Sequence, residues 1–316
     1  MTKRIKIGVA GAGVFGGYHC GKVAGLDGVD LTCVYDLDPE KALIHAKKHN
    51  VLAETDFDAL LDRSDAVVIA APAIAHYDLA RRALSAGRHV FVEKPVALTL
   101  EEADELVALA VVQGLILQVG HQERYVAEAV GLFDRKTPPV KIDCIRHTSA
   151  SGRCEDVSVV LDLMIHDIDL IRKLTGAEIE TLSAYGNSNA ADAELTLDNG
   201  ATVTLAASRR DGAPERRMTL VYEDGVIEFD FIKRAAENTT PSPLHACFDG
   251  EDAPLSFTDP LAYGAAAFAA AIAAGTAPQV TGADGRMALE WALRIEEAAG
   301  IEMASTQYKT PERRRA

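Results

Sequence analysis

Two patterns of hydrophobic and polar positions divide the chain. Over residues 1–120, short apolar runs typical of buried strands alternate with amphipathic stretches of helical period. This alternation predicts an α/β fold, a doubly wound parallel sheet with helices on both of its faces. Residues 1–120 are therefore expected to form a first domain. The runs that we assign to strands are IKIGVAG, VDLTCVYD, AVVIAAP, HVFVEKP and LILQVG.

The rhythm changes from about residue 135. A strand-like segment, PVKIDCIRHT, precedes one helix, and several strand-like segments then follow without helices between them. Asn-Gly and Asp-Gly turn signals separate some of these segments. The pattern predicts an α+β second domain over residues 121–316, a largely antiparallel sheet covered by helices on one face. Closing helices are expected near 260–274 and 282–300, free to pack back on the first domain, and residues 235–260 receive no assignment.

One predicted helix, LDLMIHDIDL at residues 161–170, is more polar than a buried helix should be. Asp162, His166 and Asp169 fall at i, i+4 and i+7, so they form a narrow polar stripe between two apolar strips. Because a helix on a surface needs only one apolar face, this arrangement predicts a helix that lines a cleft. The alternative is an ordinary polar face in contact with water. Asp167 lies off the stripe.

The first predicted strand runs into GAGVFG, which places Gly11, Gly13 and Gly16 in a G-x-G-x-x-G pattern at the start of a helix. Such a turn lets the backbone approach a pyrophosphate, and the helix N-terminus offers it unpaired N–H groups. Asp36 ends the second strand, where a carboxylate can accept hydrogen bonds from the ribose diol of adenosine. Its charge would repel the 2′-phosphate of NADP, so the sequence favours NAD over NADP. A βαβ turn without a ligand is the alternative.

Charge and composition argue against several kinds of partner. The chain has 316 residues, a formal net charge of −15 and a pI near 5.0, whereas surfaces that bind nucleic acid or anionic lipid are usually basic. We therefore expect no nucleic-acid partner and no membrane partner. An Asp and a His four residues apart lack a third ligand at recognisable spacing, so no metal site is predicted. The chain has five cysteines, which are scattered and odd in number: Cys20, Cys33, Cys144, Cys154 and Cys247. This usage favours free thiols in a reducing compartment, so we expect a cytoplasmic location.

Several motifs, in order along nearly the whole chain, resemble the Gfo/Idh/MocA family, the glucose–fructose oxidoreductase and inositol dehydrogenase group. They are the strand–GxGxxG–helix start, AAPAIAH, AGRHVFVEKP, VGHQERY, VVLDLMIHDIDLIRKL and VTGADGRMALEWALRIEEA. The most specific are Glu93-Lys94-Pro95 at the end of a predicted strand and D-x-x-x-H at Asp162 and His166. The resemblance implies an NAD-dependent oxidoreductase that transfers hydride between the nicotinamide and a secondary hydroxyl or keto group of a sugar.

The resemblance also implies roles for individual residues. Lys94, Asp162 and His166 would surround the reacting carbon beside the nicotinamide, so the polar stripe would be the substrate-facing wall of the site. A neutral His is a suitable base, and Lys94 can stabilise alkoxide charge on the same oxygen; which of the two is the base stays open. The expected cofactor-binding residues are Gly11, Gly13, Val14, Phe15, Gly16, Asp36, Ala71, Pro72, His76, Glu93 and Lys94.

The segments GHQERY and DVSVVLDLMIHD are similar to the UDP-N-acetylglucosamine 3-dehydrogenase branch of the family, which implies a nucleotide sugar as substrate. Where that branch carries Phe-Asn-Pro, this chain has Tyr125-Val126-Ala127. A free polyol, an inositol or an aldose is therefore an alternative substrate. Glycoside cleavage through transient oxidation, or non-catalytic sensing of NAD, is an alternative function. The expected substrate-binding residues are His121, Gln122, Arg124, Arg153, Asp162 and His166.

The predicted antiparallel sheet has one face without helices. Strands such as ATVTLAAS and VIEFDFI look too apolar to leave that face in water. We expect a homodimer or homotetramer assembled through this face, as the family resemblance also implies.

Overall fold

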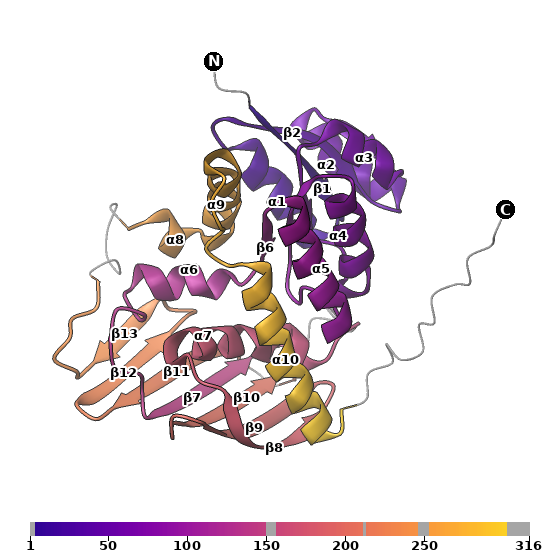
Figure 1. Cartoon of the computed structure of the whole chain (residues 1–316). Coiled ribbons are helices and arrows are strands. Elements are labelled where there is room, and N and C mark those ends of the chain that lie inside the picture. The colour runs from indigo at the N-terminus through magenta and orange to yellow at the C-terminus, as the bar shows by residue number, and fades with distance from the viewer. Residues whose placement is uncertain (1–3, 150–155, 211–212, 246–252, 302–316) are drawn as a thin grey trace.

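The computed structural model describes residues 4–149, 156–210, 213–245 and 253–301. It shows two sheets, with helices packed against each and between them (Figure 1). No helix in this part of the chain combines the length and the apolar character that a membrane crossing requires.

The first sheet has six parallel strands among the described residues, in the order β3-β2-β1-β4-β5-β6. The chain changes direction across the sheet between β1 and β4, and helices cover both faces (Figure 1). The central strands are apolar throughout because both of their faces are buried. The elements are β1 (Ile5–Ala10), α1 (Val14–Ala24), β2 (Val29–Tyr35), α2 (Pro39–His49), β3 (Leu52–Glu54), α3 (Phe57–Arg63), β4 (Ala66–Ile69), η1 (Ala73–Ala75), α4 (His76–Ser85), β5 (His89–Val92), α5 (Leu100–Gln113) and β6 (Leu117–Val119).

The second sheet has seven described strands in the order β13-β12-β11-β7-β10-β9-β8. Only the β7–β10 pair in this described sheet is parallel, so the prediction of a largely antiparallel sheet is confirmed. The unassigned segment 235–260 contributes an edge strand and a short helix. The elements are α6 (Gln122–Ala129), β7 (Lys141–His147), the π-helical turn η2 (Val160–Met164), α7 (Ile165–Thr175), β8 (Ile179–Asn187), β9 (Ala190–Leu197), β10 (Thr202–Ser208), β11 (Glu215–Tyr222), β12 (Gly225–Asp230), β13 (Ala235–Asn238), α8 (Leu255–Thr258), α9 (Pro260–Ala274) and α10 (Gly282–Ala299).

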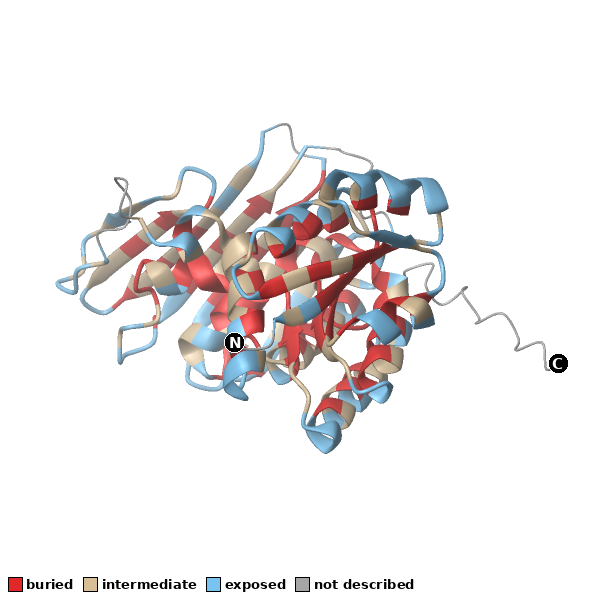
Figure 2. Cartoon of the chain, turned by 90° about the horizontal axis from the view of Figure 1, so that it is seen from above, coloured by how far each residue is buried: buried red, intermediate tan, exposed pale blue. Residues whose placement is uncertain are grey.

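Burial alternates along the strands of the second sheet, as a sheet with one covered face requires (Figure 2). On β10, Val203 and Leu205 are buried, whereas Thr202 and Thr204 belong to the open face. Neighbouring β9 likewise places Glu194 on that face. The expectation that the open face is too apolar for water is therefore wrong over these strands, because the apolar residues of ATVTLAAS point inward.

The last two long helices return to the first domain. Helix α9 lies against α1, and α10 lies between α5 of the first domain and α7 and β8 of the second (Figure 1). The β6 strand joins the segment before α10 through a hydrogen bond from the Val119 N–H to the Val280 carbonyl, 3.2 Å. The two sheets are thus connected by packed helices as well as by the chain between them.

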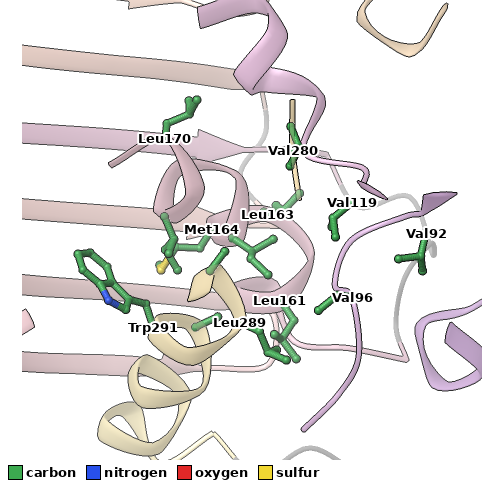
Figure 3. Close-up of a cluster of buried hydrophobic side chains, with 14 of the residues drawn as sticks. Val92, Val96, Val119, Leu161, Leu163, Met164, Leu170, Val280, Leu289 and Trp291 are labelled. Carbon is green, nitrogen blue, oxygen red and sulfur yellow. The ribbon is translucent and has the colours of Figure 1, made fainter. Parts of the chain in front are cut away.

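A buried apolar cluster fills the space where η2, α7, α10 and the ends of β5 and β6 meet (Figure 3). Leu161 lies near Leu289 of α10 and Val96, which follows β5. Trp291 is fully buried on the same helix, and its Nε1–H donates to Glu178 at 3.2 Å. This cluster fixes η2 and α7 relative to the carboxyl end of β5, which Glu93 and Lys94 follow.

One buried carboxyl group, that of Glu296, has an oxygen without a hydrogen-bond partner among the described residues. Glu296 on α10 is 8% exposed, and its Oε1 has no hydrogen-bond partner among the described residues. Burial raises the pKa of Glu296 to about 7, although a hydrogen bond from Ser158 opposes the rise. The folded protein therefore holds this proton to a higher pH than the unfolded chain, whose reference value is 4.5.

This raised pKa predicts a pH-dependent stability. Stability from the protonated carboxyl is fully present below the unfolded value and is lost as pH rises through about 7. Glu296→Gln should therefore raise the Tm at about pH 8.5 by a few degrees and change it little at about pH 5. Scanning calorimetry at both pH values measures the effect. Glu297→Gln, at the exposed neighbouring position, is the matched control, and an equal Tm gain from both variants would contradict the assignment.

Candidate active site

The glycine-rich turn between β1 and α1 leaves open space at a helix N-terminus. Gly11 has φ +95°, and a Cβ there would lie 2.6 Å from the Ala70 backbone. A Cβ on Gly16 would lie 1.8 Å from the Gly11 carbonyl oxygen, whereas one on Gly13 would meet nothing within 4 Å. The first N–H groups of α1 have no side-chain cap. Two glycines thus close the turn tightly, and the third lies where a pyrophosphate would approach the helix.

Three further predicted cofactor residues, Val14, Phe15 and Asp36, lie beside the glycine turn. Val14 and Phe15 begin α1 with about half of their surface exposed, at 49% and 48%. Asp36 follows β2, and its Oδ2 accepts a hydrogen bond from the Ala12 N–H at 2.7 Å. Its Oδ1 accepts from the Asp38 N–H at 2.9 Å. The Asp36 carboxylate therefore fixes the glycine turn, and each oxygen keeps a second lone pair with which to accept a ribose hydroxyl.

The loop after β4 holds three predicted cofactor residues in different surroundings. Ala71 is half-buried and Pro72 is exposed, so both can border a ligand. His76 is 2% exposed, and its ring nitrogens lie 2.7 Å from the Pro95 oxygen and 2.9 Å from the Ala71 oxygen. Burial lowers the pKa of His76. Its ring therefore joins the loops that carry Ala71 and Pro95, and its contact with a cofactor stays a prediction.

Glu93 connects the glycine-turn helix to the end of β5. Its Oε1 lies 2.7 Å from His19 Nε2 on α1, and Gln122 Nε2 donates to the same oxygen at 3.4 Å. Burial alone would raise the pKa of Glu93, but the bond to His19 and the charges of His19 and Lys94 hold it below its ordinary value. Glu93 is therefore an internal link that positions Lys94.

Lys94 and Asp162 meet across the two domains. The Lys94 ammonium donates to the Asp162 carbonyl oxygen at 2.6 Å and to Oδ1 at 2.9 Å. The other carboxylate oxygen lies 3.2 Å from Nη2 of Arg209, which also donates to the carbonyls of Val157 and Ser158 at 2.8 and 2.9 Å. One carboxylate is thus held by cations from both sides.

Arg209 was not predicted from the sequence. It follows the strand ATVTLAAS, and the only available signal was an arginine at the end of an apolar run. Its partners lie about fifty residues earlier in the chain, so no local spacing reveals them.

Asp162 lies in a π-helical turn rather than in the continuous α-helix that the sequence predicts. The Ser158 hydroxyl oxygen accepts hydrogen bonds from the Val160 and Leu161 N–H groups, both at 3.1 Å. This capping bond supports the start of the wider turn, and α7 continues from Ile165. Such turns are frequent at functional sites because they redirect one side chain within a helix.

His166 lies one turn after Asp162 and faces His121. The ring centroids are 6.3 Å apart and the rings are nearly perpendicular. His166 Nδ1 and both nitrogens of His121 have no hydrogen-bond partner among the described residues. Burial, followed by the charges of Lys94 and Arg146, lowers the pKa of His166 well below 6.5. Near neutral pH this imidazole is uncharged and able to accept a proton.

Arg124, another predicted substrate-binding residue, has partners inside the protein. Arg124 is 4% exposed, its Nε donates to Asp169 Oδ2 at 2.9 Å, and its Nη1 lies 3.0 Å from Asp284 Oδ1. Both carboxylates are internal partners, so the structure does not present Arg124 to a substrate. Asp169, although on the predicted polar stripe, is buried and bound to Arg124. Arg153 lies outside the described residues.

Asp167, off the polar stripe, also has an internal partner. It accepts from Arg146 Nε and Nη2 at 2.8 and 2.7 Å, and both residues are buried. Within the described chain, no three His, Cys, Asp or Glu side chains are grouped as ligands for a metal ion.

Comparison with protein families agrees with both halves of this arrangement. Residues 5–121 match the model of an oxidoreductase family with an NAD-binding Rossmann fold, and residues 133–228 match the GFO/IDH/MocA C-terminal domain. The chain belongs to the GFO/IDH/MocA oxidoreductase family. The predicted family, the α/β plus α+β fold and the use of NAD are confirmed.

Known relatives within this oxidoreductase family include enzymes of nucleotide sugars and of inositols. The UDP-N-acetylglucosamine 3-dehydrogenase of Acidithiobacillus ferrooxidans is 34% identical over 308 residues, 93% of this chain and 97% of that protein. A solved structure of that enzyme has a TM-score of 0.85 at 33% identity and covers 93% and 97% of the two chains. The scyllo-inositol dehydrogenase of Lactobacillus casei with NAD(H) and scyllo-inositol has a TM-score of 0.80 at 23% identity, covering 94% and 97%, and shares the fold.

The geometry of Asp36 predicts cofactor preference. Asp36→Ala removes the ribose acceptor and the charge that opposes a 2′-phosphate, so NAD should bind more weakly and the preference for NAD over NADP should narrow. Calorimetric titration with each dinucleotide measures both effects. Asp38→Ala is the control, because that carboxylate caps α2 by accepting from the Glu40 N–H. Unchanged NAD affinity in Asp36→Ala would show that Asp36 does not bind the ribose of the cofactor.

Proposed function

We propose that this NAD-dependent oxidoreductase oxidises a secondary hydroxyl of a nucleotide sugar, with UDP-N-acetylglucosamine as the first candidate. The observation that carries the proposal is the paired Lys94 and Asp162 beside the uncharged His166, at the carboxyl end of the NAD-binding sheet. Ligands of open α/β sheets bind at this edge. The 34% identity with the Acidithiobacillus ferrooxidans enzyme, over nearly the full length of both chains, supports the choice of substrate class.

Each side chain has a distinct task in this proposal. NAD supplies the acceptor for the hydride that leaves the carbinol carbon. His166 accepts the hydroxyl proton, since its lowered pKa keeps the ring neutral and ready to act as a base. Lys94 donates to the same oxygen and stabilises the negative charge that develops there. Asp162 orients Lys94, and Arg209 holds Asp162 from the opposite side.

A substrate screen tests the proposed function. Purified protein with NAD should show rising absorbance at 340 nm with UDP-N-acetylglucosamine, and weaker or no signal with inositols, free aldoses and free polyols. A stronger signal with an inositol than with UDP-N-acetylglucosamine would contradict the nucleotide-sugar proposal and favour the alternative substrate. NAD binding without turnover of any compound would instead favour a sensor.

The two residues nearest the reacting oxygen should affect turnover more than cofactor binding. We expect His166→Asn to lower kcat by roughly 10²–10⁴-fold because it removes the base and keeps the size. Lys94→Met should act similarly, since the lost charge stabilises the transition state more than the ground state. Steady-state kinetics and NAD titration measure the two effects.

The matched control is Lys173→Gln, at an exposed position on α7, the helix of His166. It should keep near-normal turnover. A large fall in Tm for His166→Asn, with normal activity per folded molecule, would show a structural role instead.

We also propose that the chain forms a homodimer or homotetramer through the open face of the second sheet. This face carries a hollow of about 310 Å³ on β8, β9 and β10, lined by hydroxyl side chains with Glu194 among them. The face is broad, and its mixed polar surface suits an interface built from hydrogen bonds around a few apolar contacts. Light scattering at micromolar concentration should give a dimer or tetramer mass, and a monomer mass would contradict the proposal.

A further inference from the structure

Two arginines face each other on neighbouring strands beside the proposed active site. Arg146 on β7 and Arg216 on β11 are direct partners in the antiparallel register, so they lie on the same face of the sheet. Like charges in this position destabilise a sheet unless something compensates them. Arg146 is compensated by both oxygens of Asp167 and by Glu123 at 3.0 Å. The charge of Arg216 is less well compensated than that of Arg146.

Among the described residues, the side chain of Arg216 has one ion-pair partner, Glu123, which it shares with Arg146, and it remains accessible. Its Nη1 lies 3.4 Å from Glu123 Oε1, the same oxygen that Arg146 contacts, and its side chain is 44% exposed. An exposed contact of this length contributes little to stability. The Arg216 guanidinium is therefore free to exchange this contact for a stronger one.

A third guanidinium lies near the same carboxylate. Arg234, between β12 and β13, has φ +55° and stacks over the Phe257 ring with its Cζ 5.2 Å from the centroid. Its Nη1 is buried and has no hydrogen-bond partner among the described residues. Burial lowers the pKa of Arg234, and the charge of Glu123 is the first that opposes this. Glu123 and Asp259 are thus the carboxylates whose charges act on Arg234.

This positive cluster is close to the catalytic histidine. Arg146 binds Asp167, the residue that follows His166, and Arg216 is the direct partner of Arg146 on the neighbouring strand. The charges of both arginines add to the lowering of the pKa of His166. The protein as a whole is strongly acidic, with a formal net charge of −15. A local excess of cations at the edge of the site, in such a chain, is suited to an anionic part of the substrate.

We propose that Arg216 and Arg234 form the subsite that receives the diphosphate of a nucleotide-sugar substrate. Planar guanidinium groups match phosphate oxygens in a two-point geometry that ammonium groups cannot reproduce. Glu123 holds Arg216 toward the site and yields it when phosphate oxygens arrive. This inference rests on the proposed function, because it identifies the residues by which a nucleotide sugar is preferred over an uncharged one.

The test compares two adjacent arginines of β11 in the full-length, NAD-saturated protein. Arg216 shares its face with buried Met218 and Leu220, whereas Arg217 points to the open face, where it pairs with Glu215 and Glu228. Arg216→Gln should raise the KM for UDP-N-acetylglucosamine and weaken UDP binding in calorimetry, each by roughly tenfold to a hundredfold. Its kcat should stay within about twofold. Arg217→Gln should leave all three quantities unchanged.

Conservative and second-site variants sharpen the comparison. Arg216→Lys should restore part of the UDP affinity, because it keeps the charge and loses the planar fork. Arg234→Gln should weaken UDP binding further when combined with Arg216→Gln. Increasing salt should weaken UDP binding to the wild type more than to Arg216→Gln, since fewer charges remain to be screened.

The outcomes separate this inference from the proposed function. If the wild type oxidises UDP-N-acetylglucosamine and binds UDP, but Arg216→Gln does both equally well, the inference is overturned and the function stands. A lower Tm with unchanged UDP affinity in Arg216→Gln would also overturn it, because the arginine would then be a structural ion pair. A wild type that neither binds UDP nor oxidises the nucleotide sugar would overturn both.

Discussion

The ion pair between Lys94 and Asp162 joins the two domains at the point where chemistry is proposed. Lys94 extends from the carboxyl end of β5, and Asp162 belongs to the π-helical turn before α7. Both side chains are largely removed from solvent, at 16% and 13% exposure, so Lys94 depends on Asp162 for compensation, while Asp162 is also paired with Arg209. The buried apolar cluster around Leu161 and Leu289 holds the turn in place and so keeps Asp162 within reach of Lys94. A shift of one domain against the other would separate the charges.

The other two aspartates of LDLMIHDIDL have equally specific partners. Asp167 binds Arg146 of β7, and Asp169 binds Arg124 of α6, so three acidic groups on one helical segment meet cations from three different elements. A partly buried charge is costly when its partner is missing. These pairs therefore favour one docking of the segment over sliding or rotated alternatives, and they explain why a helix so enclosed is also so acidic.

The sequence was informative wherever the governing pattern is local. Strand and helix order and the glycine turn could be predicted from periodicity and local motifs, whereas the approach of Lys94 to Asp162 was implied only by the family resemblance. The roles of Arg124 and Arg209 could not, because an arginine looks alike whether its partner is a carboxylate inside the protein or an anion in solution. The π-helical turn depends on the Ser158 hydroxyl accepting two N–H groups, which side-chain periodicity does not reveal. The open sheet face is more polar than the composition of its strands suggests, because Val203 and Leu205 of ATVTLAAS both point to the covered face.

Helix α10 contacts both sheets along its length. It begins beside β6, where Gln118 bridges to Thr281, passes α5, and ends near β8. A hinge opening between the domains would have to strip this eighteen-residue helix from one of them. The helix therefore resists separation of the two domains and helps to keep Lys94 in contact with Asp162. In a site held at a fixed width, the size of the side chains that line it would decide which substrates fit, because the two domains cannot move apart to admit a larger one.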